Sequence, residues 1–176
     1  MQFAISVPCG GECASPTALA ALAQVAEAAG WDAMLLEDYL WYHNATYHST
    51  PEATAWARSI LGAGRLLAVE QAVVLEDDPA TARRIAREFL AFYLTLPNYV
   101  RAWERAGFEP EEFVDGGSDR LVDAVVAWGS PEAIAERVTA HLEAGADHVC
   151  LRVLDPDPNA LPMAACRALA PALLGR

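Results

Sequence analysis

Two stretches of the sequence, LEAGADHVCLR at 142–152 and AEAAGWDAMLL at 26–36, follow the same pattern. Each closes a helix-forming segment with Glu and Ala, continues through a glycine, one residue and an aspartate, and then enters a mainly apolar run. Glycine is favoured at the left-handed position that ends many helices. Gly30 and Gly145 therefore predict two helix-to-strand connections, with strands expected at 33–36 and 148–153.

Two further apolar runs, 3–7 and 67–75, complete a set of four predicted strands. The run at 67–75 follows a segment in which Gly62 and Gly64 are expected to end a helix, as Gly30 and Gly145 do. All four runs are nearly continuous in apolar residues, which is typical of parallel strands covered on both faces. Strands that alternate with helical segments predict the α/β class.

Five polar residues followed by proline mark helix starts, because proline suits the first helical position and Ser, Thr or Asp before it can cap free amides. The pairs are Ser15-Pro16, Thr50-Pro51, Asp78-Pro79, Glu109-Pro110 and Ser130-Pro131, with Glu109 the weakest cap. The predicted helices span 17–29, 52–61, 80–96, 98–106, 119–127, 132–144 and 160–173. The longest, 80–96, carries an apolar stripe (Ile85, Phe89, Phe92 and Leu96) and is expected to break at Pro97.

The composition predicts one globular domain over residues 1–176. Hydrophobic residues make up 54% of the chain, and its formal charge is -12, from 24 acids and 12 arginines with no lysine. Such a surface disfavours nucleic acid and anionic membranes as partners. No apolar run approaches the roughly 18 residues of a membrane span, and no basic segment precedes QFAISV, so a cytoplasmic protein is expected.

The four cysteines, Cys9, Cys13, Cys150 and Cys166, form no C-x-x-C pair. They are interpreted as small buried residues or reduced thiols. Cys9 stands apart because it directly follows a predicted strand.

Three stretches of the chain resemble the bacterial-luciferase-like oxidoreductases, which include flavin monooxygenases and enzymes that use coenzyme F-420. They are FAISVPCGG at 3–11, ALAALAQVAEAAGWDAMLLEDYLWYHN at 18–44 and VAWGSPEAIAERV at 126–138. Residues 1–44 are similar to the start of the family's (β/α) barrel, and residues 50–176 are similar to its end.

The resemblance implies a partial TIM-type barrel: four parallel strands in the order seven-eight-one-two of the parent barrel, with helices outside. Strands three to six have no counterpart between His43 and Thr50. Loss of these strands would expose edges on strands two and seven, and exposed edges invite pairing with another chain. A homodimer is therefore expected.

The resemblance also implies a site at the carboxyl ends of the strands, where (β/α) barrels place their chemistry. The catalytic candidates are Asp38, Tyr39 and His43, and the cofactor-binding candidates are Cys9, Gly10, Asp38 and Trp41. Tyr39 stands where deazaflavin-using relatives usually have His. The expected cofactor is coenzyme F-420 or FMN.

The same residues have a plainer interpretation, in which Glu37 and Asp38 are solvated loop acids and the aromatic side chains pack on a neighbouring helix. A metal site from Glu37, Asp38, His43 and His48 is disfavoured, because their spacing matches no metal motif.

Two other residues, Ser118 and Arg152, have two interpretations each, and His141 has one. Ser118 is either an ordinary N-cap or part of an anion site in DGGSD at 115–119. Arg152 either meets an anionic cofactor tail or pairs with an acid such as Asp155. His141 is expected to be a solvated helix residue, and no site is assigned to it.

Two functions of different classes follow. The first is a luciferase-like oxidoreductase or monooxygenase that uses reduced flavin or deazaflavin on a small organic substrate. The second is a shortened, non-catalytic relative that binds flavin or serves as a structural dimer.

Overall fold

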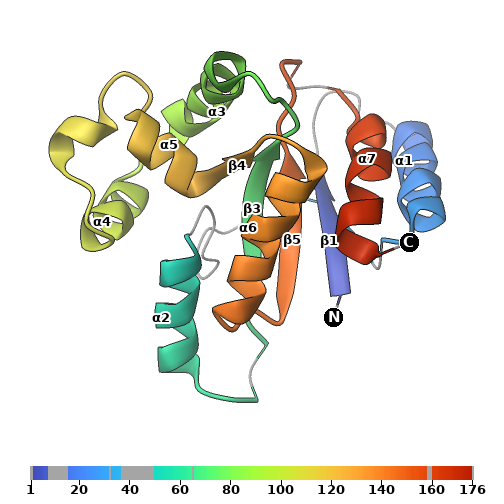
Figure 1. Ribbon diagram of the computed structural model, residues 1–176, viewed down its shortest axis with the longest axis horizontal. Coiled ribbons are helices and arrows are strands. Elements are labelled where there is room, and N and C mark those ends of the chain that lie inside the picture. Colours follow the sequence, from blue (N-terminus) through green and yellow to red (C-terminus); the bar gives the residue numbers. More distant parts are fainter. Residues whose placement is uncertain are drawn as a thin grey trace.

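The computed structural model describes residues 2–7, 16–31, 33–36, 50–64, 66–157 and 160–175. These residues form one parallel sheet with helices around it (Figure 1). The strands are β1 (Gln2–Val7), β2 (Ala33–Leu36), β3 (Ala68–Val74), β4 (Val126–Trp128) and β5 (His148–Val153). Their order in the sheet is β2-β1-β5-β3-β4.

The four predicted strands are present and lie in the predicted order. Strand β5 is paired with β1 on one side and β3 on the other, and β2 is paired with the free side of β1, all in parallel. The sheet also has a fifth strand, β4, which the sequence pattern did not predict. Because β4 pairs with β3, the expectation that β3 would be a terminal strand is wrong, and the terminal strands are β2 and β4.

Strand β4 lies where the tail of a helix was predicted. Helix α5 (Asp119–Val125) ends two residues earlier than expected because side chains from other elements bind its last carbonyls. Gln71 donates to Val125 O at 3.0 Å, and Arg137 donates to Asp123 O at 2.8 Å and to Ala124 O at 2.6 Å. The chain is then free to extend and to pair with β3.

The other α-helices lie close to their predicted positions, and the short 3-10 helix η2 begins at the predicted start Pro110. They are α1 (Pro16–Ala29), α2 (Pro51–Leu61), α3 (Pro79–Tyr93), α4 (Pro97–Arg105), η2 (Pro110–Phe113), α6 (Pro131–Glu143) and α7 (Met163–Leu174). The predicted caps are confirmed at Thr50, Asp78 and Ser130, and Ser118 is an ordinary N-cap that accepts from Leu121 N at 3.1 Å. Glu109 forms a capping box with Glu112 in η2, and Ser15 lies outside the described residues.

Helix α3 is shorter than predicted. Its last turn tightens through bonds from Thr95 N to Phe92 O and from Leu96 N to Tyr93 O, three residues apart, before α4 begins at Pro97. The buried stripe is centred on Ile85, Ala86 and Leu90, and Phe92 is 54% exposed. The prediction that Phe92 packs in the core is therefore wrong.

The sheet separates two apolar cores. Helices α1, α6 and α7 cover the face that carries Phe3, Ile5, Leu151 and Val73. Helices α3, α4 and α5 build a second core with Ala72 and Val74 on the opposite face of β3. Alternate residues of one strand point to opposite faces, so both faces need apolar side chains, and the runs in the sequence are correspondingly unbroken.

The connection from α6 to β5 has the conformation predicted from its glycine. Gly145 has φ 101°, and a Cβ there would lie 2.8 Å from Cγ of Arg58. Arg58 donates from Nε to Gly145 O at 2.8 Å and from Nη2 to Asp147 at 2.5 Å. Asp147 also accepts from Leu67 N at 2.8 Å, so the glycine and aspartate of the 142–152 stretch tie α2, β5 and the start of β3 together.

Within the described residues, none of the helices has the length and apolar character needed to cross a bilayer.

Candidate functional site

Three neighbouring strands end together at one edge of the sheet. Val7 of β1 is the register partner of Leu36 of β2, and Ser6 is the register partner of Arg152 of β5. In open parallel sheets ligands bind outside the carboxyl ends of the strands. This carboxyl edge is therefore the first place to look for a site.

The predicted site residues follow these strand ends in the sequence. Cys9 and Gly10 come after β1, and Asp38, Tyr39, Trp41 and His43 come after β2. All six lie outside the described residues, as do Glu37 and His48 of the disfavoured metal set. Their roles stay predictions.

A cavity of about 270 Å³ lies at the carboxyl edge among the described residues. Ser6, Arg152 and the loop after β5 form one side, and Phe89 of α3 forms another. The Arg152 guanidinium carbon lies 5.0 Å from the centre of the Phe89 ring, which is cation–π geometry. Register brings Ser6 and Arg152 to the same face of the sheet as α3, and α3 is held there by its apolar stripe.

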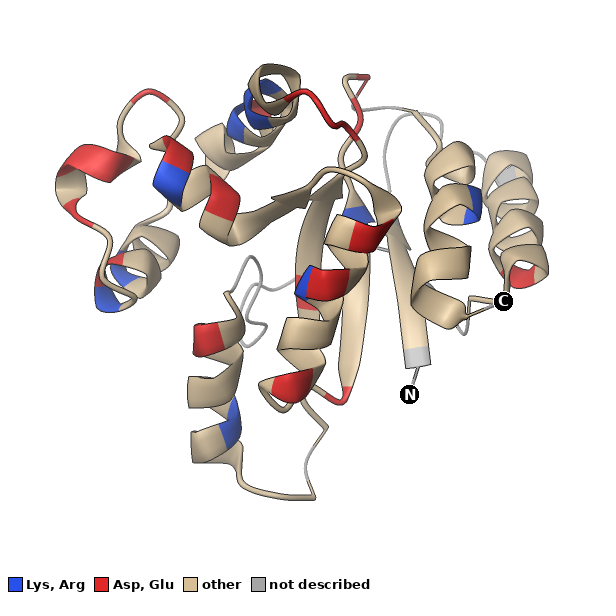
Figure 2. Ribbon diagram, viewed as in Figure 1, with Lys and Arg blue, Asp and Glu red and all other residues tan. Residues whose placement is uncertain are grey.

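The rim of this cavity is acidic. Glu88, Asp155 and Asp157 line it, and Figure 2 shows further acidic residues on the loops at this end of the sheet. Glu88 is paired with Arg84 at 2.8 Å, and Asp155 accepts from Asp157 N at 2.9 Å. The rim therefore opposes a highly anionic group, whereas the interior offers an aromatic ring, a hydroxyl and one cation.

The interior suits the ring portion of a flavin or deazaflavin better than the charged tail. Phe89 and Arg152, packed against each other, give the cavity an aromatic and a cationic wall, and Ser6 adds a polar side chain. Among the described residues that line the cavity, Arg152 supplies the positive charge for a phosphate or carboxylate. The residues present thus fit the ring of the cofactor expected from the sequence, and they would hold it through Phe89, Arg152 and Ser6.

A buried series of hydrogen bonds lies on the face of the sheet that α6 covers. His141 of α6 is fully buried, with Nδ1 2.9 Å from Thr54 Oγ1 of α2 and Nε2 2.8 Å from Gln71 Oε1 of β3. The prediction of a solvated His141 is wrong, because partners 87 and 70 residues away satisfy both ring nitrogens. Burial lowers the pKa of His141 to about 4, helped by the nearby charge of Arg137 and opposed by Glu52.

The neutral imidazole has a structural role in this chain. The amide oxygen of Gln71 accepts, so Nε2 carries the proton and Nδ1 accepts from the Thr54 hydroxyl. Gln71 then donates to Ala72 O at 2.7 Å and to Val125 O at 3.0 Å. His141 thereby connects α2, α6 and β3 with the end of α5.

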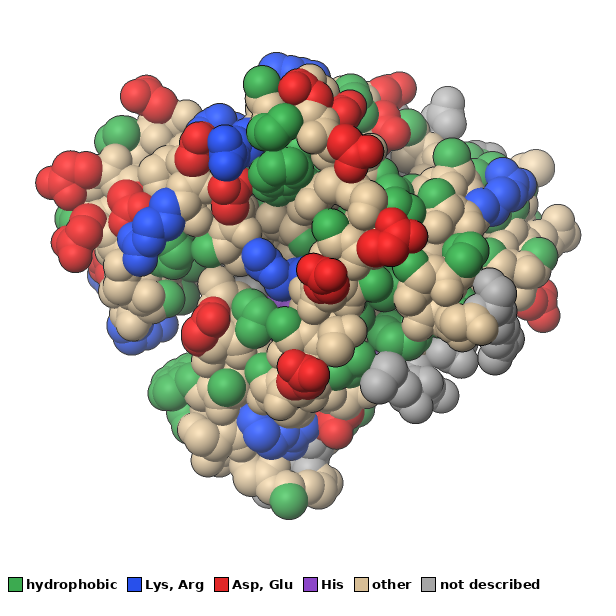
Figure 3. Space-filling view, viewed as in Figure 1, with side chains coloured by type: hydrophobic (Ala, Val, Ile, Leu, Met, Phe, Trp, Pro, Cys, Tyr) green, Lys and Arg blue, Asp and Glu red, His purple; other side chains and the backbone are tan. Residues whose placement is uncertain are grey.

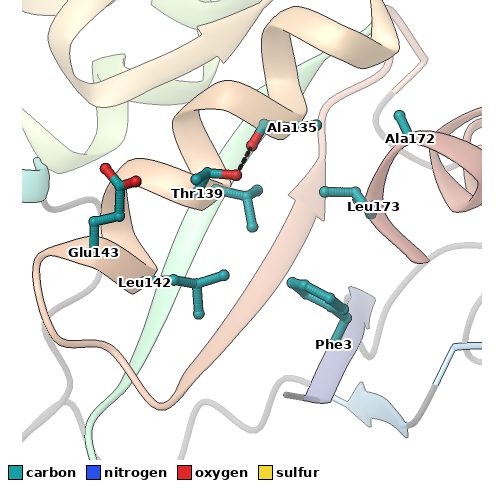
Figure 4. A pocket seen from close by; sticks show the side chains of 8 residues that line it. Phe3, Ala135, Thr139, Leu142, Glu143, Ala172 and Leu173 are labelled. Carbon is teal, nitrogen blue, oxygen red and sulfur yellow. Dashed lines mark hydrogen bonds between the residues drawn. The ribbon is translucent and has the colours of Figure 1, made fainter. Parts of the chain in front are cut away.

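Other features of the described chain offer less chemistry. Figure 4 shows a groove of about 340 Å³ between α6 and α7, in which Phe3, Leu142 and Leu173 converge near the amino end of β1. Cys150 and Cys166 are buried and form no disulfide, as predicted, and burial raises the pKa of Cys166 to about 11. No three His, Cys, Asp or Glu side chains gather as metal ligands within the ranges that the structure describes.

Comparison with known proteins gives one structural likeness. No family model matches the chain, and no curated protein matches its sequence. The structure is similar to a secondary alcohol dehydrogenase dependent on coenzyme F-420, solved with an adduct of that coenzyme and acetone. The TM-score is 0.48 and the identity 14%, over 98% of this chain and 49% of the other. The chain thus spans about half the length of that enzyme, and its membership of the luciferase-like family stays a prediction.

Proposed function

We propose that the protein is a luciferase-like oxidoreductase that binds coenzyme F-420 or FMN at the carboxyl edge of β1, β2 and β5 and acts on a small organic substrate. The cavity formed there by Ser6, Phe89 and Arg152 carries the proposal. The resemblance of residues 1–44 to the start of the family's barrel supports the choice of cofactor.

In this proposal the described residues bind and orient the cofactor. The bound cofactor would supply the redox chemistry, and Phe89 and Arg152, which lie against each other, would line the pocket that holds it. Arg152, held over Phe89, balances negative charge on the cofactor or the substrate. The Ser6 side chain lies on the same face and lines the cavity beside Arg152.

Proton transfer falls to the residues that follow β2. Asp38 is proposed to act with Tyr39 or His43, while Cys9, Gly10 and Trp41 complete the cofactor site. Histidine is the side chain best matched to proton transfer near neutrality, whereas the reference pKa of tyrosine is about 10. His43 is therefore the better proposed acid–base group of the two.

Binding and turnover measurements test this proposal. Titration with FMN and with coenzyme F-420, followed by visible absorbance, should give saturable binding of at least one, and the reduced cofactor should then transfer hydride to a small organic substrate. Replacement of Arg152 by Gln is expected to weaken binding about tenfold, equivalent to about 1.4 kcal/mol, through loss of one charge contact.

The exposed Arg101 of α4 gives a matched control for that substitution. Arg101→Gln makes the same change of net charge and should leave affinity unchanged. Equal losses of cofactor affinity in the two variants would mean that only the net charge of the protein affects binding, and would contradict a site at Arg152. Asp38→Ala should also weaken binding if Asp38 contacts the cofactor.

A second candidate is a non-catalytic relative that binds flavin or serves as a structural dimer. The open sheet, with β2 and β4 as its terminal strands, favours it, because a closed barrel would surround a cofactor more fully. Binding without hydride transfer would support a carrier, and absence of binding would support a structural role.

A homodimer is predicted under both candidate functions. Helix α2 and the segment after it expose Trp56, Ile60 and Leu66 by 61, 64 and 76%, and large exposed apolar groups often mark interfaces. Light scattering at micromolar concentration is expected to give twice the 18.9 kDa mass of one chain. Trp56→Asp should reduce that mass, and Thr139→Asp, an exposed change on α6, should not. A monomeric wild-type chain would contradict the prediction.

A further inference from the structure

A cleft of about 440 Å³ lies at the β4 edge of the sheet, apart from the carboxyl-edge cavity, between α6 and the α5–β4 connection. Ala127 and Trp128 of β4 form one wall, and Ala133, Arg137 and Ala140 of α6 form the other. Figure 3 shows a hollow in this region with a basic side chain on its floor. No part of the proposed cofactor site contributes to it.

Arg137 differs from the arginines that form ion pairs in this chain. Carboxylates lie within 4 Å of Arg58, Arg83, Arg84, Arg87 and Arg120. Half-buried Arg137 instead donates to two carbonyls, Asp123 O and Ala124 O, and among the described residues no carboxylate lies within 4 Å of it. A guanidinium has five N–H donors, so three remain after these two bonds, which is enough to hold a carboxylate through two parallel bonds.

The charge of Arg137 is partly desolvated and incompletely balanced. Burial lowers the pKa of Arg137, and the carboxylates of Glu52 and Asp123 compensate only from a distance. A partly buried charge without an ion-pair partner is unfavourable, and an anion bound beside it relieves that cost.

The walls of the cleft set the kind of anion. Three alanines and Trp128 give apolar surface beside Asp123, which also lines the cleft. Arg83 lies over the Trp128 ring, 5.5 Å from its centre, and the Trp128 N–H is already bound to Asp123 at 2.9 Å. Asp123 is further neutralised by two bonds from Arg83, at 2.9 and 2.6 Å. Exposed Glu136 at the rim adds a negative charge, which disfavours phosphates and other multiply charged anions.

We propose that this cleft is a second ligand site, which binds a small apolar or aromatic monocarboxylate with its carboxylate on Arg137 and its body against Trp128 and the alanines.

Benzoate is a suitable probe, and benzamide is its uncharged counterpart. Titration followed by NMR should move the Trp128 indole N–H resonance, assigned through Trp128→Phe, in a saturable manner with benzoate. Benzamide should bind at least about tenfold more weakly, because it cannot form the charged pair. Equal binding of the two probes, or no saturable shift with benzoate, would overturn the proposal.

Two variants locate the site. Arg137→Gln should weaken benzoate binding at least about tenfold, and Ala140→Leu should do the same by filling the cleft while leaving the bonds of Arg137 to α5 in place. Thr139→Leu, an exposed change on the same helix, is the matched control and should retain affinity. If Arg137→Gln fails to fold, Ala140→Leu decides, and unchanged affinity in that variant refutes the site. Binding of FMN or coenzyme F-420 should be unaffected by Ala140→Leu, so this result is separate from the proposed oxidoreductase function.

Discussion

Acidification from pH 7 to pH 4 is expected to remove about 3 kcal/mol of folding free energy through His141 alone. The folded-state pKa of His141 is about 4, whereas an unfolded histidine titrates near its ordinary value of 6.5. Between these values the unfolded chain binds a proton that the folded chain does not. The stability is therefore fully present above pH 6.5 and declines as the pH falls toward 4.

The physical cause is the loss of a buried acceptor. Protonation of Nδ1 turns the acceptor of the Thr54 hydroxyl into a donor and places a charge in the interior, close to Arg137. Helix α2 is held to α6 partly by this bond, so we expect local opening of α2 before global unfolding.

Denaturant unfolding of the wild type and of His141→Gln across this pH range isolates the effect. Glutamine has no titratable group, so the difference in free energy of unfolding between the two proteins should shrink by about 3 kcal/mol from pH 7 to pH 4. Hydrogen bonds lower the pKa values of Asp78, Glu112 and Asp147, so protonation of these carboxylates in acid also reduces the stability of the folded protein. They do so in both proteins and cancel. A difference that stays constant with pH would contradict the neutral, buried imidazole.

Replacement of Trp103 by Ala is expected to reduce the free energy of unfolding by about 3–5 kcal/mol. Trp103 of α4 is 3% exposed, and its ring lies 5.9 Å from that of Tyr99 and 6.4 Å from that of Phe113, centre to centre. Its carbonyl also accepts from Phe108 N at 3.1 Å at the end of α4. Truncation leaves a cavity in the second core where α4 packs on α3.

Phe92→Ala is the matched control for that experiment. Phe92 is also aromatic and lies close in the sequence, but it is 54% exposed. Its removal should cost less than about 1 kcal/mol, as for surface substitutions in general. A loss as large as that of Trp103→Ala would mean that Phe92 is buried, as the sequence pattern predicted and the structure contradicts.

Local patterns in the sequence predicted the elements that depend on local chemistry. Proline after Thr50, Asp78 or Ser130 marked helix starts, because those caps act within three residues. Gly145 and the aspartate after it marked the entry into β5 for the same reason. The order of the four strands came from resemblance to the luciferase-like family rather than from any local signal.

The predictions that failed depend on contacts between distant residues. Strand β4 was missed because no glycine or proline stands directly between Val125 and β4, and the end of α5 is set by Gln71 and Arg137. The burial of His141 depends on partners 70 and 87 residues away. At the carboxyl edge, Arg152 was considered as a ligand, but Phe89 was read only as a core residue, since nothing in the sequence places α3 over β5.

The most direct test of the proposed function is to locate the bound cofactor by NMR. Backbone amide shifts recorded during titration with coenzyme F-420 and with FMN should change at Ser6, Phe89 and residues 152–154, and in the segments that follow β1 and β2. The groove between α6 and α7 should be unaffected. Saturable binding with shifts confined to another face, or no binding of either cofactor, would contradict the claim that the carboxyl edge of this sheet is a redox-cofactor site.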